Sequence, residues 1–506
     1  MPLQPTSTLQ GKTATGPVAL PVALLVAAFV AFWTLRAVVS TYNLDTFGDM
    51  VENYAWGIGW QFGYYKHPPF FAWLTAAWFS VFPRNEAAYY LLSMTSIALA
   101  LLAMWRIATR FFDRPRQLLI LIAAFFLPPL TFLAQNYNAT SAMVPLWALT
   151  FLLYLRLFER RSTFDALLLG VFAGLAILAK YHSVLLLAAL ATHALFDREA
   201  RPLWATRLPF VALLAFAATV GPHALWMVHT DFLTVRYAAE QGTGSWADTL
   251  VDAAEFFPAM LLYMVPALIP VLLAVPRFPR RAELGRGWQA LTGSIGGRAL
   301  IAAALVPAAL TLVLGLVLNA ELSSLWSIPF FVFIPLLLVA LLAPAPGPLR
   351  LDRALIALAI YTAAVLSASP LIERRTLATA RGASALPVDR IADAAQDEWH
   401  RATGRRFAIA AGDGMIANAA AFYATDRPYA IQQASLALTP WVTAEDIARD
   451  GALYLCSTES DEVCRRQALA LFGRIDRELM LEMPAPAGAG GPALHTVPLF
   501  FRLPSG

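Results

Sequence analysis

The chain has 506 residues, of which 59% are hydrophobic and 14% are charged, and its formal net charge is +4. Soluble domains contain about 25% charged residues, so this composition excludes a soluble globular protein and predicts a polytopic membrane protein. The small positive charge does not indicate nucleic-acid binding, because the arginines stand in short clusters between apolar runs.

The first apolar run covers about residues 17–39 and is long enough to cross ~30 Å of hydrocarbon. It exceeds the core of a signal peptide and is not followed by a small-residue cleavage site, so we expect a membrane anchor. Further runs lie at about 86–106, 117–135, 139–157, 163–179, 183–196, 207–228, 256–276, 299–318, 325–343 and 353–370. We therefore predict about eleven spans, although 183–196 could instead form a re-entrant hairpin with the run before it.

The arginines indicate how the chain is oriented. Loops on one side of the predicted membrane carry arginine clusters, at 106–116, 156–161, 198–207, 277–298 and 350–353. The opposite loops carry few basic residues. The positive-inside rule places the arginine-rich side in the cytoplasm. The first 16 residues are then a cytoplasmic tail, whereas the long first loop at 40–85 and the loop at 229–255 face outward, which in a bacterium is the periplasm.

The chain changes character after the predicted transmembrane domain at 17–370. In 371–506 the long apolar runs stop, and short strands such as 407–412, 451–456 and 495–503 alternate with predicted helices. This pattern predicts a small periplasmic α/β domain. Its two cysteines, Cys456 and Cys464, could form a disulfide outside the cytoplasm; the sequence leaves this open.

The first outer loop contains most of the side chains that could take part in catalysis. Asp49 and Glu52 are three residues apart and would share a helix face. Pro68 and Pro69 would end that helix and hold Lys66 and His67 beside it. A carboxylate can activate an acceptor hydroxyl as a base, and a lysine can bind a phosphate leaving group. The loop therefore predicts transfer of a sugar from a lipid phosphate, by a single displacement with inversion.

Each of these residues also has a structural interpretation. Exposed acids are usually solvated, tryptophan and tyrosine at a membrane interface are usually anchors, and Lys66 could extend its ammonium to the interface. The occurrence of all of them in one short loop favours catalysis.

The same loop resembles a known family. An acid, then aromatics, then Gly63-Tyr64-Tyr65, a charged residue, His-Pro-Pro and Trp73-Leu74 are similar to the first loop of the GT-C glycosyltransferases of the protein O-mannosyltransferase and aminoarabinose transferase group. The motif similarity covers roughly 40–110. The number of spans, the long first loop and the outer C-terminal domain are also similar.

The resemblance implies an inner-membrane enzyme that uses a polyprenyl-phosphate sugar and no nucleotide sugar. It implies that Asp49 is the essential acid and that Lys66 contacts the donor phosphate. In our hypothesis Glu52 and His67 support them, with Glu52 as a second catalytic residue. Two departures are present. Met50 follows Asp49 where many members have a second acid, and Asn138 stands where many have an aspartate in the next outer loop.

Further residues are candidates for binding the donor phosphate or sugar. They lie in the first loop, the next outer loop, the outer end of two helices and a loop long enough to act as a lid: Tyr64, Tyr65, His67, Asn138, Lys180, His182, Arg236 and Tyr237. Lys180 and His182 could equally be helix-end anchors. No metal-site spacing is found, so we expect no cofactor, and a divalent cation is left open.

The leading hypothesis is an inverting glycosyltransferase with a lipid or glycan acceptor, with lipid A or another envelope glycolipid favoured, and the bilayer as its surroundings. The alternative is a transporter or flippase for lipid-linked sugars, which would require inverted repeats and charges near the membrane midplane. A non-catalytic assembly protein is a third reading, and it would tolerate Asp49→Asn.

Overall fold

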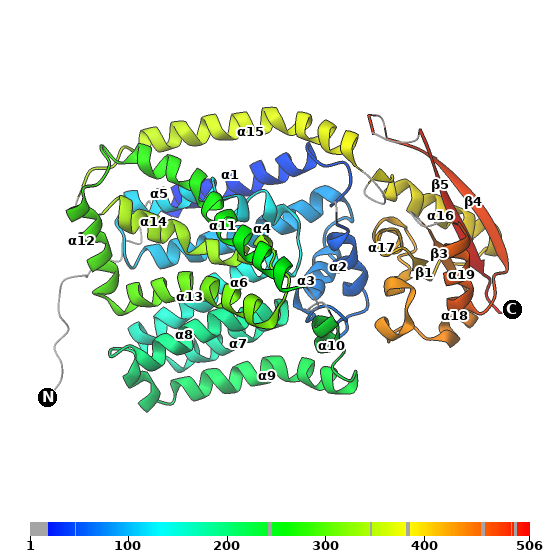
Figure 1. The fold of residues 1–506 in the computed structure, drawn as a ribbon, viewed down its shortest axis with the longest axis horizontal. Helices are drawn as coiled ribbons and strands as arrows, with labels where there is room; N and C mark the ends of the chain where they lie inside the picture. The colour runs from blue at the N-terminus through cyan, green and yellow to red at the C-terminus, as the bar shows by residue number, and fades with distance from the viewer. Residues whose placement is uncertain are drawn as a thin grey trace.

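The computed structural model describes residues 19–45, 47–240, 245–344, 347–380, 385–456, 461–486, 488–489 and 493–505. The cytoplasmic tail predicted for 1–16 lies outside the described residues. Long, roughly parallel helices form a bundle, and a small α/β domain covers one end of it (Figure 1).

In the described chain, seven helices are long and apolar enough to cross a membrane. They are α1 (Ala19–Val38), α4 (Glu86–Ala108), α6 (Ala139–Arg160), α9 (Leu208–His229), α11 (Trp246–Ala274), α13 (Ile295–Leu318) and α15 (Leu351–Thr379). Two bent pairs raise this number to nine. One joins α5 (Arg114–Ala124) to η1 (Pro128–Leu130) and η2 (Leu133–Gln135), and the other joins η5 (Ser324–Val332) to α14 (Ile334–Leu342).

The remaining two predicted runs correspond to the shorter apolar helices α7 (Thr163–Ala179) and α8 (Val184–Phe196). The polytopic helical fold is therefore confirmed, while the count of eleven spans stays a prediction. On α9 and α15, large apolar side chains such as Leu214 and Ile360 are exposed, which is the pattern of a surface that faces lipid. On α7, Gly170 lets α9 approach so closely that a Cβ there would lie 2.1 Å from the Ala212 carbonyl oxygen.

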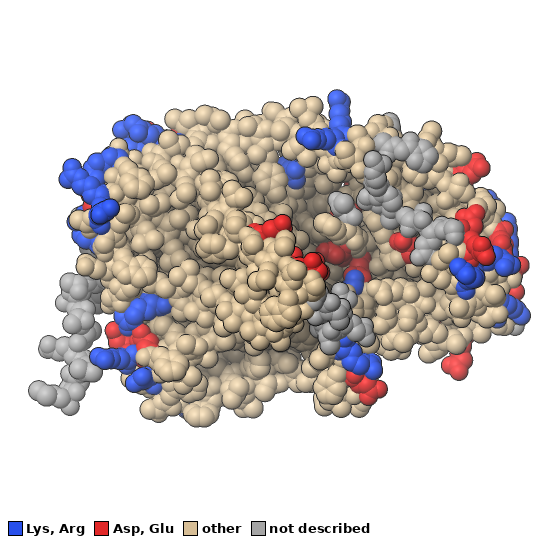
Figure 2. Space-filling model, viewed as in Figure 1, with Lys and Arg blue, Asp and Glu red and all other residues tan. Residues whose placement is uncertain are grey.

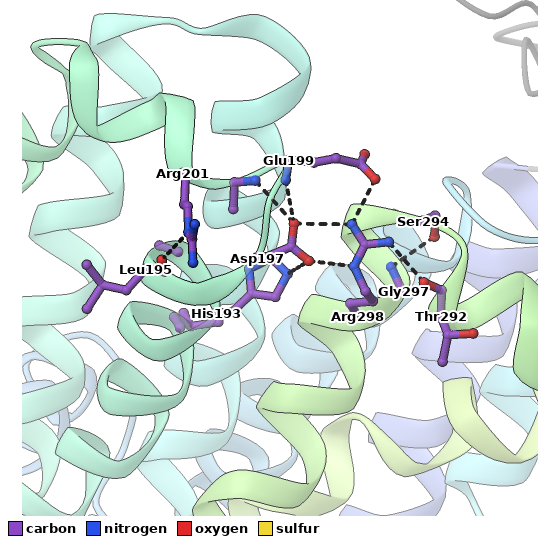
Figure 3. Close-up of polar contacts among 12 residues, drawn as sticks. His193, Leu195, Asp197, Glu199, Arg201, Thr292, Ser294, Gly297 and Arg298 are labelled. Carbon is purple, nitrogen blue, oxygen red and sulfur yellow. Dashed lines mark hydrogen bonds and ion pairs between the residues drawn. The ribbon is translucent and has the colours of Figure 1, made fainter.

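Charged side chains gather at the left end of the helical bundle, near its junction with the C-terminal domain and on that domain, and a band across the bundle is nearly uncharged (Figure 2). An ion-pair network shows how one end is fixed (Figure 3). Asp197, which follows α8, lies 2.5 Å from the Arg298 guanidinium on α13, and Glu199 lies 2.9 Å from it. These contacts lie on the arginine-rich side, so they hold α8 and α13 together at the end away from the C-terminal domain.

The C-terminal domain contains a five-stranded sheet in the order β2-β1-β3-β5-β4. Its strands are β1 (Ile409–Gly412), β2 (Tyr429–Ala430), β3 (Ala452–Leu455), β4 (Arg477–Pro484) and β5 (Leu494–Arg502), and its helices are α16 (Val388–Thr403), α17 (Gly414–Tyr423), α18 (Ala444–Asp450) and α19 (Asp461–Phe472). β1 pairs in parallel with β2 and β3, and β5 pairs antiparallel with β3 and β4. The predicted small α/β domain is confirmed. β4 was not predicted, because most of its side chains are exposed and show no apolar run.

The domain is anchored to the first outer loop, which contains α2 (Asp49–Gly57) and α3 (Phe70–Phe79). α17 packs against α2, and the Phe422 ring lies 5.2 Å from that of Tyr54. From the same loop, the Arg84 guanidinium donates to the backbone oxygens of Phe422, at 2.6 Å, and Ala424, at 3.0 Å. The outer loop is thus enclosed between the membrane helices and the C-terminal domain.

Cys456 and Cys464 are paired as a disulfide, with their Cα atoms 6.1 Å apart. The first follows β3 and the second lies on α19, so the bond ties the helix to the sheet. This spacing lies within the range that a disulfide spans without backbone movement. Persistent disulfides form in oxidising compartments such as the periplasm.

We predict that protein purified from membranes without reductant does not react with a maleimide until it is unfolded and reduced. Two maleimides should then be added per chain, because the sequence contains only two cysteines. Intact-mass spectrometry measures this directly. Labelling of unfolded protein before reduction would contradict the pairing.

Candidate active site

The start of α2 is fixed by the carboxylate of Asp45. Its oxygens accept the backbone N–H groups of Phe47 at 2.9 Å, Asp49 at 3.0 Å and Met50 at 2.8 Å. Gly48, at φ 78°, makes the left-handed turn that brings the chain back over this carboxylate. Burial, together with the neighbouring Asp49, raises the pKa of the Asp45 carboxyl to about 6. Asp45 therefore places Asp49 at the first position of the helix.

Asp49 is held from the opposite side by Asn138. The Asn138 side-chain oxygen accepts the backbone N–H groups of Thr140 and Ser141 and so caps α6. Its side-chain nitrogen must then point away from α6, and it donates to Asp49 Oδ2 at 3.0 Å. Within the described residues no hydrogen bond reaches Asp49 Oδ1. One oxygen of Asp49 is thus fixed and the other is free to accept a proton.

Glu52 and Lys66 form a closed ion pair. The Lys66 ammonium lies 2.9 Å and 3.1 Å from the two carboxylate oxygens of Glu52, and the Tyr65 hydroxyl donates to the same carboxylate at 3.3 Å. Burial alone would lower the pKa of Lys66, but the Glu52 carboxylate raises it above its usual value. Lys66 is therefore charged, and much of that charge is already neutralised by Glu52.

Lys180 is the contrasting cation. Its ammonium donates to Thr140 Oγ1 at 3.0 Å and lies 5.7 Å from the ring centre of Trp326. In the part of the chain that the structure describes, no carboxylate lies within 4.0 Å of it. Burial lowers the pKa of Lys180 to about 8, although Asp49 acts in the opposite direction. Lys180 thus offers an unpaired positive charge close to Asp49.

These groups line one cavity of about 510 Å³ at the outer end of the bundle. It brings together the following predicted residues: Asp49, Glu52, Lys66, His67, Asn138 and Lys180. His67 is neutral, because burial and the two nearby lysines lower the pKa of its imidazole well below the usual value. A cavity of about 620 Å³ lies in the C-terminal domain, but Asp413 is the only charged side chain among the described residues that line it, and this carboxylate caps α17. The smaller cavity is therefore the better candidate for charge-dependent chemistry.

The other predicted residues lie outside this cavity. The ring of Tyr64 is buried and stacks on Trp56 at 4.9 Å. Tyr65 and Tyr237 pack edge to face at 5.2 Å, so they support the Glu52 side of the site. The His182 ring lies 5.8 Å from that of Phe330. Arg236 is exposed on α10 (Leu233–Glu240).

Several residues of the site were not predicted. Arg36, Asp45 and Gln135 line the cavity, and Gln433 from the C-terminal domain donates to the Tyr65 hydroxyl at 3.2 Å. Gln433 has a left-handed φ of 49°, which is uncommon for a residue other than glycine. Asp45 alone had a sequence signal, as an acid next to the loop motif. Gln433 had none, because only folding brings it to a loop 368 residues away.

We predict that Lys66→Met lowers the free energy of unfolding by about 2 kcal/mol, because it leaves a carboxylate that is only 13% exposed without its partner. The double variant Glu52→Gln/Lys66→Met should recover most of this loss. Thermal unfolding in detergent micelles measures the difference. Arg465→Met is the matched control, since it breaks an exposed ion pair with Glu478 and should change stability by less than about 1 kcal/mol. Equal effects of Lys66→Met and Arg465→Met would contradict the analysis.

Comparison with protein families and characterised proteins gives one family match and two relatives. The model of the family described as dolichyl-phosphate-mannose-protein mannosyltransferase matches residues 66–226. Lipid A galacturonosyltransferase RgtD of Rhizobium johnstonii is 26% identical over 256 residues, which are 49% of this chain and 53% of that protein. Lipopolysaccharide core galacturonosyltransferase RgtB of the same organism is 27% identical over 251 residues, 48% of this chain and 49% of that protein. The matches thus span about half the length of both relatives.

Comparison with solved structures extends over nearly the whole chain. ArnT from Cupriavidus metallidurans bound to undecaprenyl phosphate has a TM-score of 0.59 at 16% identity and covers 96% of this chain and 98% of its own. The apo state of the same protein has a TM-score of 0.57 at 14% identity, with the same coverage. At this identity the likeness shows the fold. The resemblance seen in the first loop is confirmed at the level of the fold: the chain has the membrane-protein fold of ArnT.

Proposed function

We propose that the protein is an inverting glycosyltransferase that moves a sugar from a polyprenyl-phosphate donor to lipid A or another envelope glycolipid. The observation that carries this proposal is that one cavity contains two free groups. One is the Asp49 carboxylate oxygen that accepts no hydrogen bond from the described residues, and the other is the Lys180 ammonium, which has no carboxylate partner among them. A base and an unneutralised cation are what this transfer needs.

The transfer needs one proton acceptor. Asp49 Oδ1 takes the proton of the acceptor hydroxyl, and the hydroxyl oxygen attacks the anomeric carbon of the donor sugar. The bond from this carbon to the phosphate oxygen breaks, and the phosphate leaves with the electron pair. The leaving phosphate needs no proton, only positive charge and hydrogen-bond donors. A single attack from the face opposite the phosphate inverts the anomeric configuration.

We assign the cation of Lys180 to the donor phosphate, because it has no carboxylate partner. Lys66 donates to the phosphate those N–H groups that are not bound to Glu52. Glu52 positions Lys66. Asn138 cannot act as a base because it is an amide, and its contact with Asp49 at 3.0 Å makes it a positioning residue. No second acid is required by this assignment.

The similarity to RgtD and RgtB supports lipid A or the lipopolysaccharide core as acceptor, and a hexuronic acid as the sugar. The structure of ArnT bound to undecaprenyl phosphate supports a polyprenyl-phosphate donor. We place the enzyme in the bacterial inner membrane with its active site in the periplasm. The arginine-rich loops at the opposite end of the bundle and the Cys456–Cys464 disulfide support this orientation. The flippase alternative lacks comparable support, because the similar characterised proteins are transferases.

The test is mass spectrometry of lipid A and core glycans from a strain that lacks the gene, complemented at matched membrane levels. Wild type should restore one hexuronic acid residue, and Asp49→Asn should not, because an amide cannot take the proton. Asn138→Ala should restore part of it, since Asp49 keeps its place on α2. Full restoration by Asp49→Asn would contradict the catalytic assignment and favour the assembly reading. Absence of any glycan change in the deletion strain would contradict the transferase.

The pKa of Lys180 predicts an alkaline limit to activity. Below about pH 8 its ammonium is charged and can bind the donor phosphate, and above this pH the charge is lost. In purified protein, kcat/KM should therefore fall as pH rises through about 8, by up to tenfold per pH unit. Lys180→Arg should move this limit to higher pH, because a guanidinium stays protonated. A limit at the same pH in Lys180→Arg would show that another group causes it.

A further inference from the structure

Arg36 is a second unpaired cation in the cavity. It extends from the outer end of α1, its side chain lines the cavity and only 8% of the residue is exposed. The guanidinium donates to the side-chain oxygen of Gln135 and lies 4.8 Å from the ring centre of Phe132. Its Nε atom is buried without a hydrogen-bond partner, and no carboxylate of the described chain lies within 4.0 Å.

Hydrogen bonds to Gln135 orient the group that faces the guanidinium of Arg36. Gln135 donates its side-chain nitrogen to the Trp33 carbonyl oxygen at 3.2 Å, and its backbone oxygen accepts the Ser93 hydroxyl at 2.9 Å. The Gln135 side-chain oxygen therefore faces Arg36. The position of Arg36 in the last turn of α1 favours a cation through the helix dipole. The helix dipole supplies no hydrogen-bond acceptor for the Nε–H of Arg36, so it does not explain why this donor has no partner.

Among the described residues that line the cavity, two cations have no carboxylate within 4.0 Å. Glu52 neutralises Lys66, and Asp45 is occupied by three backbone N–H groups. Asp49 is the base. Lys180 contacts Thr140 and Arg36 contacts Gln135. The two cations therefore lie at different ends of the loop between η2 and α6. The donor phosphate is the anion that we assign to Lys180. The described chain contains no anion that pairs with Arg36.

We propose that Arg36 binds a second oxyanion of the bound substrates, separate from the donor phosphate. The oxyanion is a carboxylate on the transferred sugar or a phosphate on the acceptor. A guanidinium suits both, because it carries a permanent positive charge and its planar N–H groups match the oxygens of a carboxylate or a phosphate. Arg36 then selects acidic substrates, and this inference rests on the proposed transferase function.

The experiment measures kcat/KM of detergent-solubilised protein on four substrate pairs. The donor is a polyprenyl phosphate that carries galacturonic acid or galactose, and the acceptor is lipid A with or without its phosphates. Arg36→Gln removes the charge and Arg36→Lys keeps it without the planar fork. Arg374→Gln is the matched control, because Arg374 is an exposed arginine at the outer end of α15.

Arg36→Gln should lower kcat/KM on the order of 100-fold for pairs that carry the recognised oxyanion, mainly through KM, and by less than about threefold for pairs that lack it. Arg36→Lys should lie between wild type and Arg36→Gln, and Arg374→Gln should match wild type. A loss that disappears with the galactose donor assigns the oxyanion to the sugar. A loss that disappears with dephosphorylated lipid A assigns it to the acceptor.

An equal loss on all four pairs, or no loss on any pair, would overturn the inference. Failure of wild type to transfer either sugar would instead overturn the proposed function itself. Thermal unfolding separates binding from a structural role. Arg36→Gln should unfold at the wild-type temperature or above it, because it removes a buried charge that has no partner in the free protein. A clearly lower unfolding temperature would show that Arg36 serves the fold, and would also overturn the inference.

Discussion

The side-chain amide of Asn138 connects the membrane helices to the proposed base. Because its oxygen is used to cap α6, its nitrogen has only one direction left, which is toward Asp49. Asp49 in turn begins a helix that the Asp45 carboxylate starts. The N-termini of α2 and α6 therefore meet at the carboxylate of Asp49. Asp45 fixes its backbone at the start of α2, and Asn138 at the start of α6 fixes its side chain. The geometry of the site depends on this meeting, since α2 alone would leave the Asp49 side chain free to turn toward solvent.

Charge pairing explains how the cations divide their roles. In a half-buried cavity an unpaired charge is costly, so most charged groups find partners inside the protein. Lys66 satisfies this rule through Glu52, whereas Lys180 and Arg36 do not. A cation that remains unpaired in the free protein is ready to bind an anion without first breaking an internal contact. The motif lysine is therefore the less available of the two lysines, and the one at the end of α7 is the stronger candidate for the donor phosphate.

The C-terminal domain supports the site from outside the cavity. α17 packs on α2, Arg84 binds the backbone at the end of α17, and Gln433 reaches the Tyr65 hydroxyl that contacts Glu52. These contacts form an outer layer that restrains the ion pair from the side opposite the bilayer. A group held in this way keeps its orientation when substrate enters, which is what preorganised catalysis requires.

The sequence by itself determined the membrane class, the small α/β domain and the loop that carries Asp49, Glu52 and Lys66, and its arginines predict the orientation of the bundle. These features depend on composition and on residues close together in the chain, so hydropathy and local motifs reveal them. The tertiary structure alone decided which cations are paired, that Asn138 faces Asp49, and that Arg36, Gln135 and Gln433 join the site. Except for the Lys66–Glu52 pair, which is 14 residues apart, these contacts link residues about 90 to 370 positions apart. Side-chain pairing over such separations depends on how the helices pack, and no local pattern in the sequence records it.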